Sequence, residues 1–278
     1  MRRRKLLTFL PATVASLLIV QIAHATPVTP ISTVSLDGSS SSVWDPTNAS
    51  DGCLDSDGAA YAAVDDGGIG LLSDAFDGGL VLIVDGKRFV DSDDTGNLVG
   101  ESLTTGPMAV HGVQVLRTDR AIGTVLRTLV KLTNTRAVGQ SFPIALDSDL
   151  GSDGDGEIRA SSDGNLNVTA ADRWFITSDD AATPGDPVLT FVSHGKGQVR
   201  SRGDSPRFGD GTECVVTHWR VSVPAHSVRF LLLITEMSTT NASAISKAAR
   251  FNNQRLNSTL LAGIGPAKRA KVLNWDLT

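Results

Sequence analysis

The chain has 278 residues, of which 30 are acidic and 25 are Lys or Arg, giving a formal net charge of −5. An acidic surface disfavours polyanionic partners such as nucleic acid. Aromatic residues make up only 5% of the chain, with a single tyrosine, which disfavours a sugar site built from stacked rings. The length fits one large all-β domain or two small domains.

The first 25 residues have the features of a secretory signal peptide. Met1–Lys5 is basic, Leu6–Ile22 is largely apolar, and Ala23–Ala25 offers small residues to a signal peptidase. Pro11 interrupts the apolar stretch, so a retained membrane anchor is the weaker alternative. Removal of this segment leaves 21 basic and 30 acidic residues, a net charge of −9. We therefore expect a secreted or periplasmic protein with no membrane segment in its mature form.

Residues 26–43 are rich in Pro, Thr and Ser and are expected to form a linker or an edge strand before a domain over residues 44–240. The two cysteines, Cys53 and Cys214, lie within this domain. In an oxidising compartment they are predicted to form a disulfide; two buried free thiols are the alternative. Ile69–Leu72 and Leu80–Val84 read as strands, and the second lacks polar alternation, which indicates burial on both faces.

The most regular pattern lies between His111 and Leu146. Apolar residues recur at every second position in three runs, as in strands that each bury one face. The connections are expected at Arg117–Arg120 and Asn134–Gly139, which are too short for a parallel crossover. The centre of the chain is therefore predicted to be an antiparallel meander.

The meander is expected to run into a carboxylate-rich loop from Asp147 to Glu157. Five side chains there could ligate a metal ion: Asp147, Asp149, Asp153, Asp155 and Glu157. Hard cations such as calcium prefer this chemistry, but the spacing is not that of an EF-hand, because Ala160 stands where a bidentate Glu is required. A structural calcium site is one interpretation, and a solvated hairpin tip is the other.

Further short strands follow, divided by Gly, Pro and Asp, and they complete the prediction of an all-β antiparallel sandwich. Their ranges are 165–168, 174–177, 188–192, 214–221 and 228–234. On the fourth strand, His218 and Arg220 would share one face while Trp219 points to the other. That face could bind an anionic sugar, although a merely polar outward face explains the pattern as well.

Residues 241–278 change period and are expected to form a helical tail that packs on the domain. Asn241 or Ser243 could cap a helix that continues to Phe251, and a second helix is predicted over Pro266–Leu273. Trp275 would dock the tail onto the sandwich.

The stretch Leu260–Leu273 resembles a helix-hairpin-helix turn. In that family a Gly-apolar-Gly loop presents backbone amides to nucleic-acid phosphates, and Lys268, Arg269 and Lys271 would add positive charge. This gives a nucleic-acid-binding alternative that the predicted export and the acidic composition disfavour.

Three segments, Arg127–Thr135, Leu150–Gly154 and Asp172–Asp179, resemble a module of uncharacterised secreted bacterial proteins. That module is similar to the supersandwich of galactose-mutarotase-like domains, and the likeness spans about Leu71 to Phe251. It implies an antiparallel supersandwich and a carbohydrate context. No catalytic residue carries over, because no matched position supplies the His and Glu pair of mutarotase chemistry.

Taken together, these features favour an exported β-sandwich with a binding or surface-structural role, possible stabilisation by calcium, and a carbohydrate or other cell-surface component as partner. A carbohydrate-active enzyme or glycan-binding protein is the first alternative, and its catalytic residues are unknown.

Overall fold

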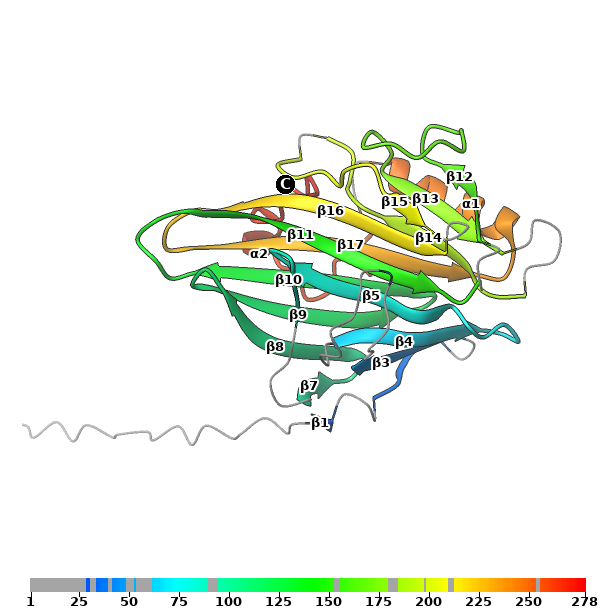
Figure 1. Ribbon diagram of the computed structural model, residues 1–278, viewed down its shortest axis with the longest axis horizontal. Helices are drawn as coiled ribbons and strands as arrows, with labels where there is room; N and C mark the ends of the chain where they lie inside the picture. The colour runs from blue at the N-terminus through cyan, green and yellow to red at the C-terminus, as the bar shows by residue number, and fades with distance from the viewer. Residues whose placement is uncertain are drawn as a thin grey trace, which may run out of the picture.

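The chain folds into two antiparallel β-sheets packed face to face, with its helices at the C-terminal end (Figure 1). The computed structural model describes residues 29–30, 34–39, 42–48, 53, 62–89, 95–152, 156–179, 185–197, 199–209, 213–253 and 256–278. The predicted signal peptide lies outside the described residues. The predicted antiparallel β-sandwich with a short C-terminal helical segment is confirmed.

The first sheet has nine strands. Their spatial order is β1 (Thr29–Pro30), β7 (Thr95–Val99), β8 (Ser102–Val110), β9 (Val113–Ile122), β10 (Val125–Asn134), β17 (Ser227–Ser238), β14 (Val188–Val192), β13 (Trp174–Ser178) and β12 (Glu157–Ser161).

The second sheet has eight strands. Seven follow the order β15 (Arg207–Gly209), β16 (Cys214–Val223), β11 (Gln140–Leu150), β5 (Phe76–Val84), β4 (Ala62–Ile69), β3 (Ser42–Asn48) and β2 (Leu36–Ser39), and β6 (Lys87–Arg88) pairs with the end of β5. Two of the N-terminal strands are therefore edges: β1 borders the nine-stranded sheet and β2 borders the eight-stranded sheet.

The main core lies between the sheets and is filled by alternate residues of each strand. Strand β5 contributes Leu80, Leu82 and Val84 to this core. Its intervening residues Val81 and Ile83 are buried on the opposite face of the sheet. Burial on both faces, which the lack of polar alternation predicted, is confirmed.

Strand β9 corrects the predicted position of the first meander connection. It runs unbroken through Arg117–Arg120, and the turn lies at Gly123, whose φ of +61° suits glycine. Arg117 and Asp119 point into the core rather than into solvent. The prediction was wrong because a run of charged and polar residues is typical of a turn, and the sequence does not show that one face of this strand is buried.

Strand β11 corrects the predicted start of the acidic loop. It continues to Leu150, so Asp147 and Asp149 lie in the strand and only the residues after Leu150 can form the connection. Pairing with β16 on one side and with β5 on the other holds these positions extended.

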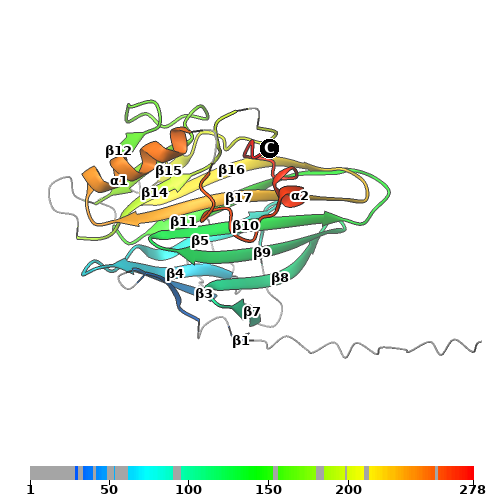
Figure 2. The ribbon, with the colours of Figure 1, turned by 180° about the vertical axis from the view of Figure 1, so that it is seen from behind.

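The C-terminal segment covers part of the outer face of the nine-stranded sheet (Figure 2). It contains α1 (Asn241–Ala248), a 3₁₀ turn over Ala249–Asn252 and α2 (Pro266–Arg269), which is shorter than predicted. The N-cap of α1 is Thr240 rather than Asn241 or Ser243, because the Thr240 side chain accepts a hydrogen bond of 3.2 Å from the Ser243 amide. None of the helices among the described residues is long and apolar enough to span a membrane.

Two residues near the end of the chain hold this segment against β17. Trp275 is buried, and its Nε1 donates a hydrogen bond of 2.7 Å to the Leu232 carbonyl. The Asn274 side chain accepts from the Leu232 amide at 2.9 Å and donates to the Leu232 and Ser193 carbonyls at 2.8 and 2.9 Å. The tail therefore completes the hydrogen bonding of β17 as well as covering its apolar side chains.

Candidate ligand-binding face

The predicted pair His218 and Arg220 lies on the outer face of the eight-stranded sheet. In the register of β16 against β11, His218 pairs with Ala145 and Arg220 with Pro143. Trp219 points the other way into the core, where its Nε1 donates to the Ser193 carbonyl at 3.0 Å. Strand alternation alone therefore brings the two polar side chains onto one face.

A segment outside the named strands extends this face beyond the free side of β16. Gly203 forms an antiparallel bridge with Trp219, which sets Arg202 opposite Arg220 and Asp204 opposite His218. The Asp204 carboxylate accepts a hydrogen bond of 2.8 Å from the His218 amide, and its other oxygen lies 3.6 Å from His218 Nδ1. Both oxygens of the Asp204 carboxylate therefore face His218, and these contacts hold the segment beside β16.

Arg202 and Arg220 form a pair of like charges on this face. Both are exposed, and directly opposed residues of antiparallel neighbours have Cβ atoms about 4.5–5.5 Å apart. Among the residues that the structure describes, neither guanidinium lies within 4.0 Å of a carboxylate oxygen. An anion bound between the two guanidiniums would reduce the repulsion between their like charges.

Arg202 is the residue of this face that the sequence did not identify. Its partner depends on how a loop pairs with a distant strand, and no local pattern encodes that register. The charge of Arg202 also acts on the interior: burial first, then Arg202 and Arg173, lower the pKa of His194 to about 4, against an opposing effect of Asp172. His194 is therefore neutral at neutral pH and adds no charge to the face.

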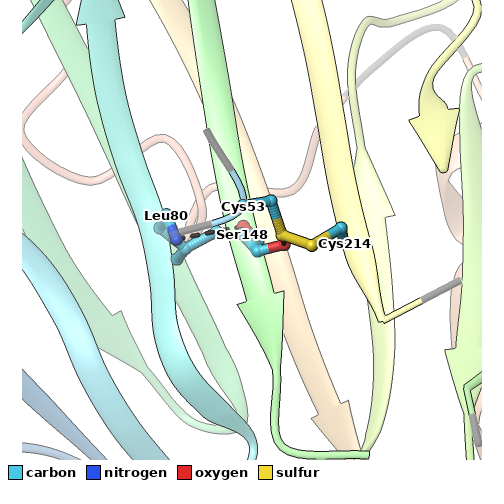
Figure 3. The surroundings of a disulfide bond; sticks show 4 residues. All are labelled: Cys53, Leu80, Ser148 and Cys214. Carbon is cyan, nitrogen blue, oxygen red and sulfur yellow. Dashed lines mark hydrogen bonds between the residues drawn. A yellow bond between two sulfur atoms is a disulfide. The ribbon is translucent and has the colours of Figure 1, made fainter. Parts of the chain in front are cut away.

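The predicted disulfide between Cys53 and Cys214 is confirmed, and it anchors the first residue of β16 (Figure 3). The two Cα atoms are 5.3 Å apart. The Cys53 sulfur also lies 3.2 Å from the Ser148 carbonyl oxygen, a contact rather than a hydrogen bond because a disulfide sulfur carries no hydrogen. The Ser148 hydroxyl in turn accepts a hydrogen bond of 3.0 Å from the Leu80 amide, linking the disulfide region to β5.

The predicted calcium ligands that the structure describes are divided between the two sheets. Asp147 is buried in β11 between Val81 and Val216, and Asp149 pairs with Cys214. Glu157 begins β12 in the other sheet, where it is exposed and forms an ion pair of 2.5 Å with Arg159. Asp153 and Asp155 lie outside the described residues.

Within the described part of the chain, one group of metal-ligating atoms lies close together, formed by Cys53, Asp149 and Cys214. Its two sulfurs are already joined in the disulfide. A separate small cavity of about 10 Å³ lies beside the described ends of the acidic loop, and its lining includes Asp74, Ser152, Asp179 and Asp186. None of the described predicted ligands, Asp147, Asp149 and Glu157, lines this cavity.

The tail presents a different surface from that of a helix-hairpin-helix. Residues 258–263 form turns rather than a first helix, and α2 has four residues. Ile264 is buried against the sheet. The surrounding basic side chains contact carbonyl oxygens of this turn, so its arrangement differs from a loop that offers amides to phosphate.

No known protein family matches the sequence, and none of the curated proteins is similar to it. Among solved structures, the Slr1438 protein of Synechocystis sp. PCC 6803 is 12% identical with a TM-score of 0.45, over 78% of this chain and 98% of that protein. The heparinase III-BT4657 gene product is 14% identical with a TM-score of 0.30, over 59% of this chain and 24% of that protein. A Klebsiella pneumoniae protein assigned as an aldose 1-epimerase is 11% identical with a TM-score of 0.31, over 61% and 63%. At TM-scores below 0.5, these similarities assign neither a family nor an activity to this chain.

Proposed function

We propose that this chain is an exported β-sandwich that binds a carboxylated sugar through Arg202, His218 and Arg220. The observation that carries the proposal is the opposed, exposed pair Arg202 and Arg220, which has no carboxylate within 4.0 Å among the described residues. The disulfide supports export, because such bonds persist in oxidising compartments.

The chemistry of these side chains suits a carboxylate better than a neutral sugar. Guanidinium groups present planar N–H donors that match the two oxygens of a carboxylate. His218 adds an imidazole ring beside the two arginines. Trp219, which lies between His218 and Arg220 in the sequence, is buried in the core. Binding would therefore depend on charge and hydrogen bonds rather than on ring stacking.

The proposal is tested by calorimetric titration of the disulfide-bonded protein, residues 26–278, with uronate oligosaccharides and with neutral oligosaccharides of equal length. The double variant Arg202→Gln/Arg220→Gln removes both guanidiniums. Each charge-assisted hydrogen bond contributes about 1.5–3 kcal/mol, so Kd should rise by roughly a hundredfold or more.

The matched control is Lys87→Gln/Arg136→Gln, which removes two exposed charges elsewhere and should leave Kd within about twofold. Equal losses in both double variants, or no uronate binding by the wild type, would contradict the proposal. Measuring the length of the oligosaccharide after the titration tests the enzymatic alternative. An intact oligosaccharide agrees with a binding role, and a shortened oligosaccharide agrees with a carbohydrate-active enzyme.

A further inference from the structure

A second group of basic side chains gathers on the other sheet, where the tail meets β10. Arg127 projects from the outer face of β10 and is 4% exposed. Its Nη1 donates to the carbonyls of Leu260 and Ala262 at 2.8 and 2.7 Å. Directly opposite on β9, Arg120 places its own Nη1 3.5 Å from the Ala262 carbonyl oxygen.

Two more cations approach the same turn from α2. Lys268 Nζ lies 3.4 Å from the Gly263 carbonyl oxygen, and Arg269 Nε donates to the Ile264 carbonyl at 2.7 Å. With Arg120 and Arg127, four basic side chains thus contact the carbonyls of residues 260–264. In the described part of the chain, no carboxylate oxygen lies within 4.0 Å of any of the four.

The buried Arg127 keeps its positive charge at neutral pH. Burial, followed by the charge of Arg120, lowers the pKa of Arg127 to about 10, still well above neutrality. Carbonyl dipoles stabilise the guanidiniums but do not cancel their net charge. The turn therefore holds a cluster of uncompensated cations in a chain whose overall charge is negative.

Beside this cluster, the tail covers only the end of β9 near Arg120 and Ile122, and it leaves the rest of β9 and β8 uncovered (Figure 2). By strand alternation, the outward positions of β8, β9 and β10 carry mostly neutral side chains with hydroxyl or amide groups, and one further lysine. They include Thr104, Gln114, Leu116, Thr118, Lys131 and Thr133. The outward positions of these three strands include no acidic residue. These outward positions therefore carry mainly polar side chains, with the cations of the turn beside them.

We infer that this surface, the basic face of Arg120, Lys131, Lys268 and Arg269 above the buried Arg127, is a binding site for an extended anionic polysaccharide. Hydroxyl and amide side chains can hydrogen-bond sugar hydroxyls while the cations bind the acidic groups. The face lies on the sheet opposite to the Arg202–Arg220 pair and uses none of its residues, so the inference stands independently of the proposed function.

A nucleic acid is the competing occupant, and the side chains of the face argue against it. Single strands bind through aromatic side chains on which bases stack. The outward positions of β8, β9 and β10 carry no aromatic residue, and Phe230 on the neighbouring strand is buried beneath the tail. Polysaccharide binding needs no such stacking when charge supplies the affinity.

The experiment measures binding of the disulfide-bonded protein to immobilised dextran sulfate, alginate, neutral dextran and single-stranded DNA by biolayer interferometry, over a range of salt concentrations. All proteins in this experiment carry Arg202→Gln/Arg220→Gln, so that the carboxylate site of the proposed function does not contribute to binding. The variant adds Arg120→Gln/Lys268→Gln, which leaves the buried Arg127 in place. We expect Kd for dextran sulfate or alginate to rise at least tenfold, with a shallower dependence on salt, and neutral dextran not to bind. Preference between the two polymers distinguishes a sulfate from a carboxylate ligand.

The control Lys87→Gln/Arg207→Gln makes the same change in net charge on the other sheet and should shift Kd less than twofold. Equal losses in both variants would indicate general attraction by charge and would overturn the site, as would absence of binding to both anionic polysaccharides. Tighter binding of DNA, lost in the same variant, would overturn the polysaccharide in favour of nucleic acid. Lys131→Gln, at a half-buried position, is a second variant that tests the same face if the double variant does not fold.

Discussion

Arg117 and Asp119 form an ion pair inside the core, between the two sheets: Arg117 Nε lies 2.6 Å from Asp119 Oδ2, and both side chains are buried. Arg117 also donates to the Leu80 carbonyl of the opposite sheet at 2.6 Å, and Thr128 donates to the other Asp119 oxygen. These contacts cross-link β9, β10 and β5 at the centre of the sandwich.

We predict that Asp119→Asn lowers the free energy of unfolding by about 3–5 kcal/mol, because it leaves the Arg117 charge buried without its counter-ion. Urea denaturation of the disulfide-bonded protein measures the change. The control Asp85→Asn breaks the exposed contact between Asp85 and His111 and should cost at most about 1 kcal/mol. Similar decreases in the free energy of unfolding for the two substitutions would show that the buried ion pair stabilises the protein no more than the exposed contact does.

Asn274 provides a test of how the tail is held. Its fully buried amide satisfies the Leu232 amide and two carbonyls, so Asn274→Ala should destabilise the protein by about 3 kcal/mol through unpaired backbone groups. Thermal unfolding and hydrogen exchange of the Leu232 amide report the effect. Lys271→Ala, at an exposed position of the same segment, should leave both unchanged.

Calcium binding by the acidic loop remains a prediction from the sequence. Asp153 and Asp155 are two residues apart in the sequence, and their carboxylates would repel one another less around a divalent cation. Millimolar calcium should therefore raise the melting temperature, by a stabilisation of about 2.7 kcal/mol at a hundredfold excess over Kd, and a chelator should reverse it.

The double variant Asp153→Asn/Asp155→Asn should abolish the calcium response while leaving the calcium-free protein folded. Glu101→Gln, at the distant turn between β7 and β8, is the matched control and should keep the response. Identical melting of the wild type in calcium and in chelator would mean that this loop is a solvated turn.

His194 predicts a specific dependence of stability on pH. Its pKa falls to about 4 in the folded protein, below the usual value near 6.5, so the unfolded chain binds the proton more readily. The stabilising contribution is therefore present above pH 6.5 and is lost as the pH falls from 6.5 to 4, at up to about 1.4 kcal/mol per pH unit.

Urea denaturation at several pH values should show a flatter profile for His194→Gln over this range than for the wild type. His226→Asn, at an exposed turn position with φ of +48°, should retain the wild-type profile. A wild-type free energy of unfolding that does not fall between pH 6.5 and 4 would contradict burial of a neutral His194.

The sequence by itself determined most of the strands, the antiparallel connection at Asn134–Gly139 and the change to helix near Asn241, because alternation of period two and turn residues are local properties of the chain. It placed strands wrongly at Ile69–Leu72 and at residues 165–168. The same alternation placed His218 and Arg220 on one face, and the expectation of an oxidising compartment led to the predicted disulfide. In β5 even the burial of both faces followed from the absence of polar residues.

Only the tertiary structure decided which charged residues lie inside and which distant residues become neighbours. Arg117 and Asp119 were read as a turn because their burial depends on Leu80 of the opposite sheet, which no local pattern reveals. The register of a loop set Arg202 opposite Arg220, and the path of the tail brought Arg120 and Lys268 to neighbouring carbonyls of residues 262 and 263. Pairing between segments far apart in sequence is set by the packing of whole sheets, so the binding faces emerge only when those sheets are assembled.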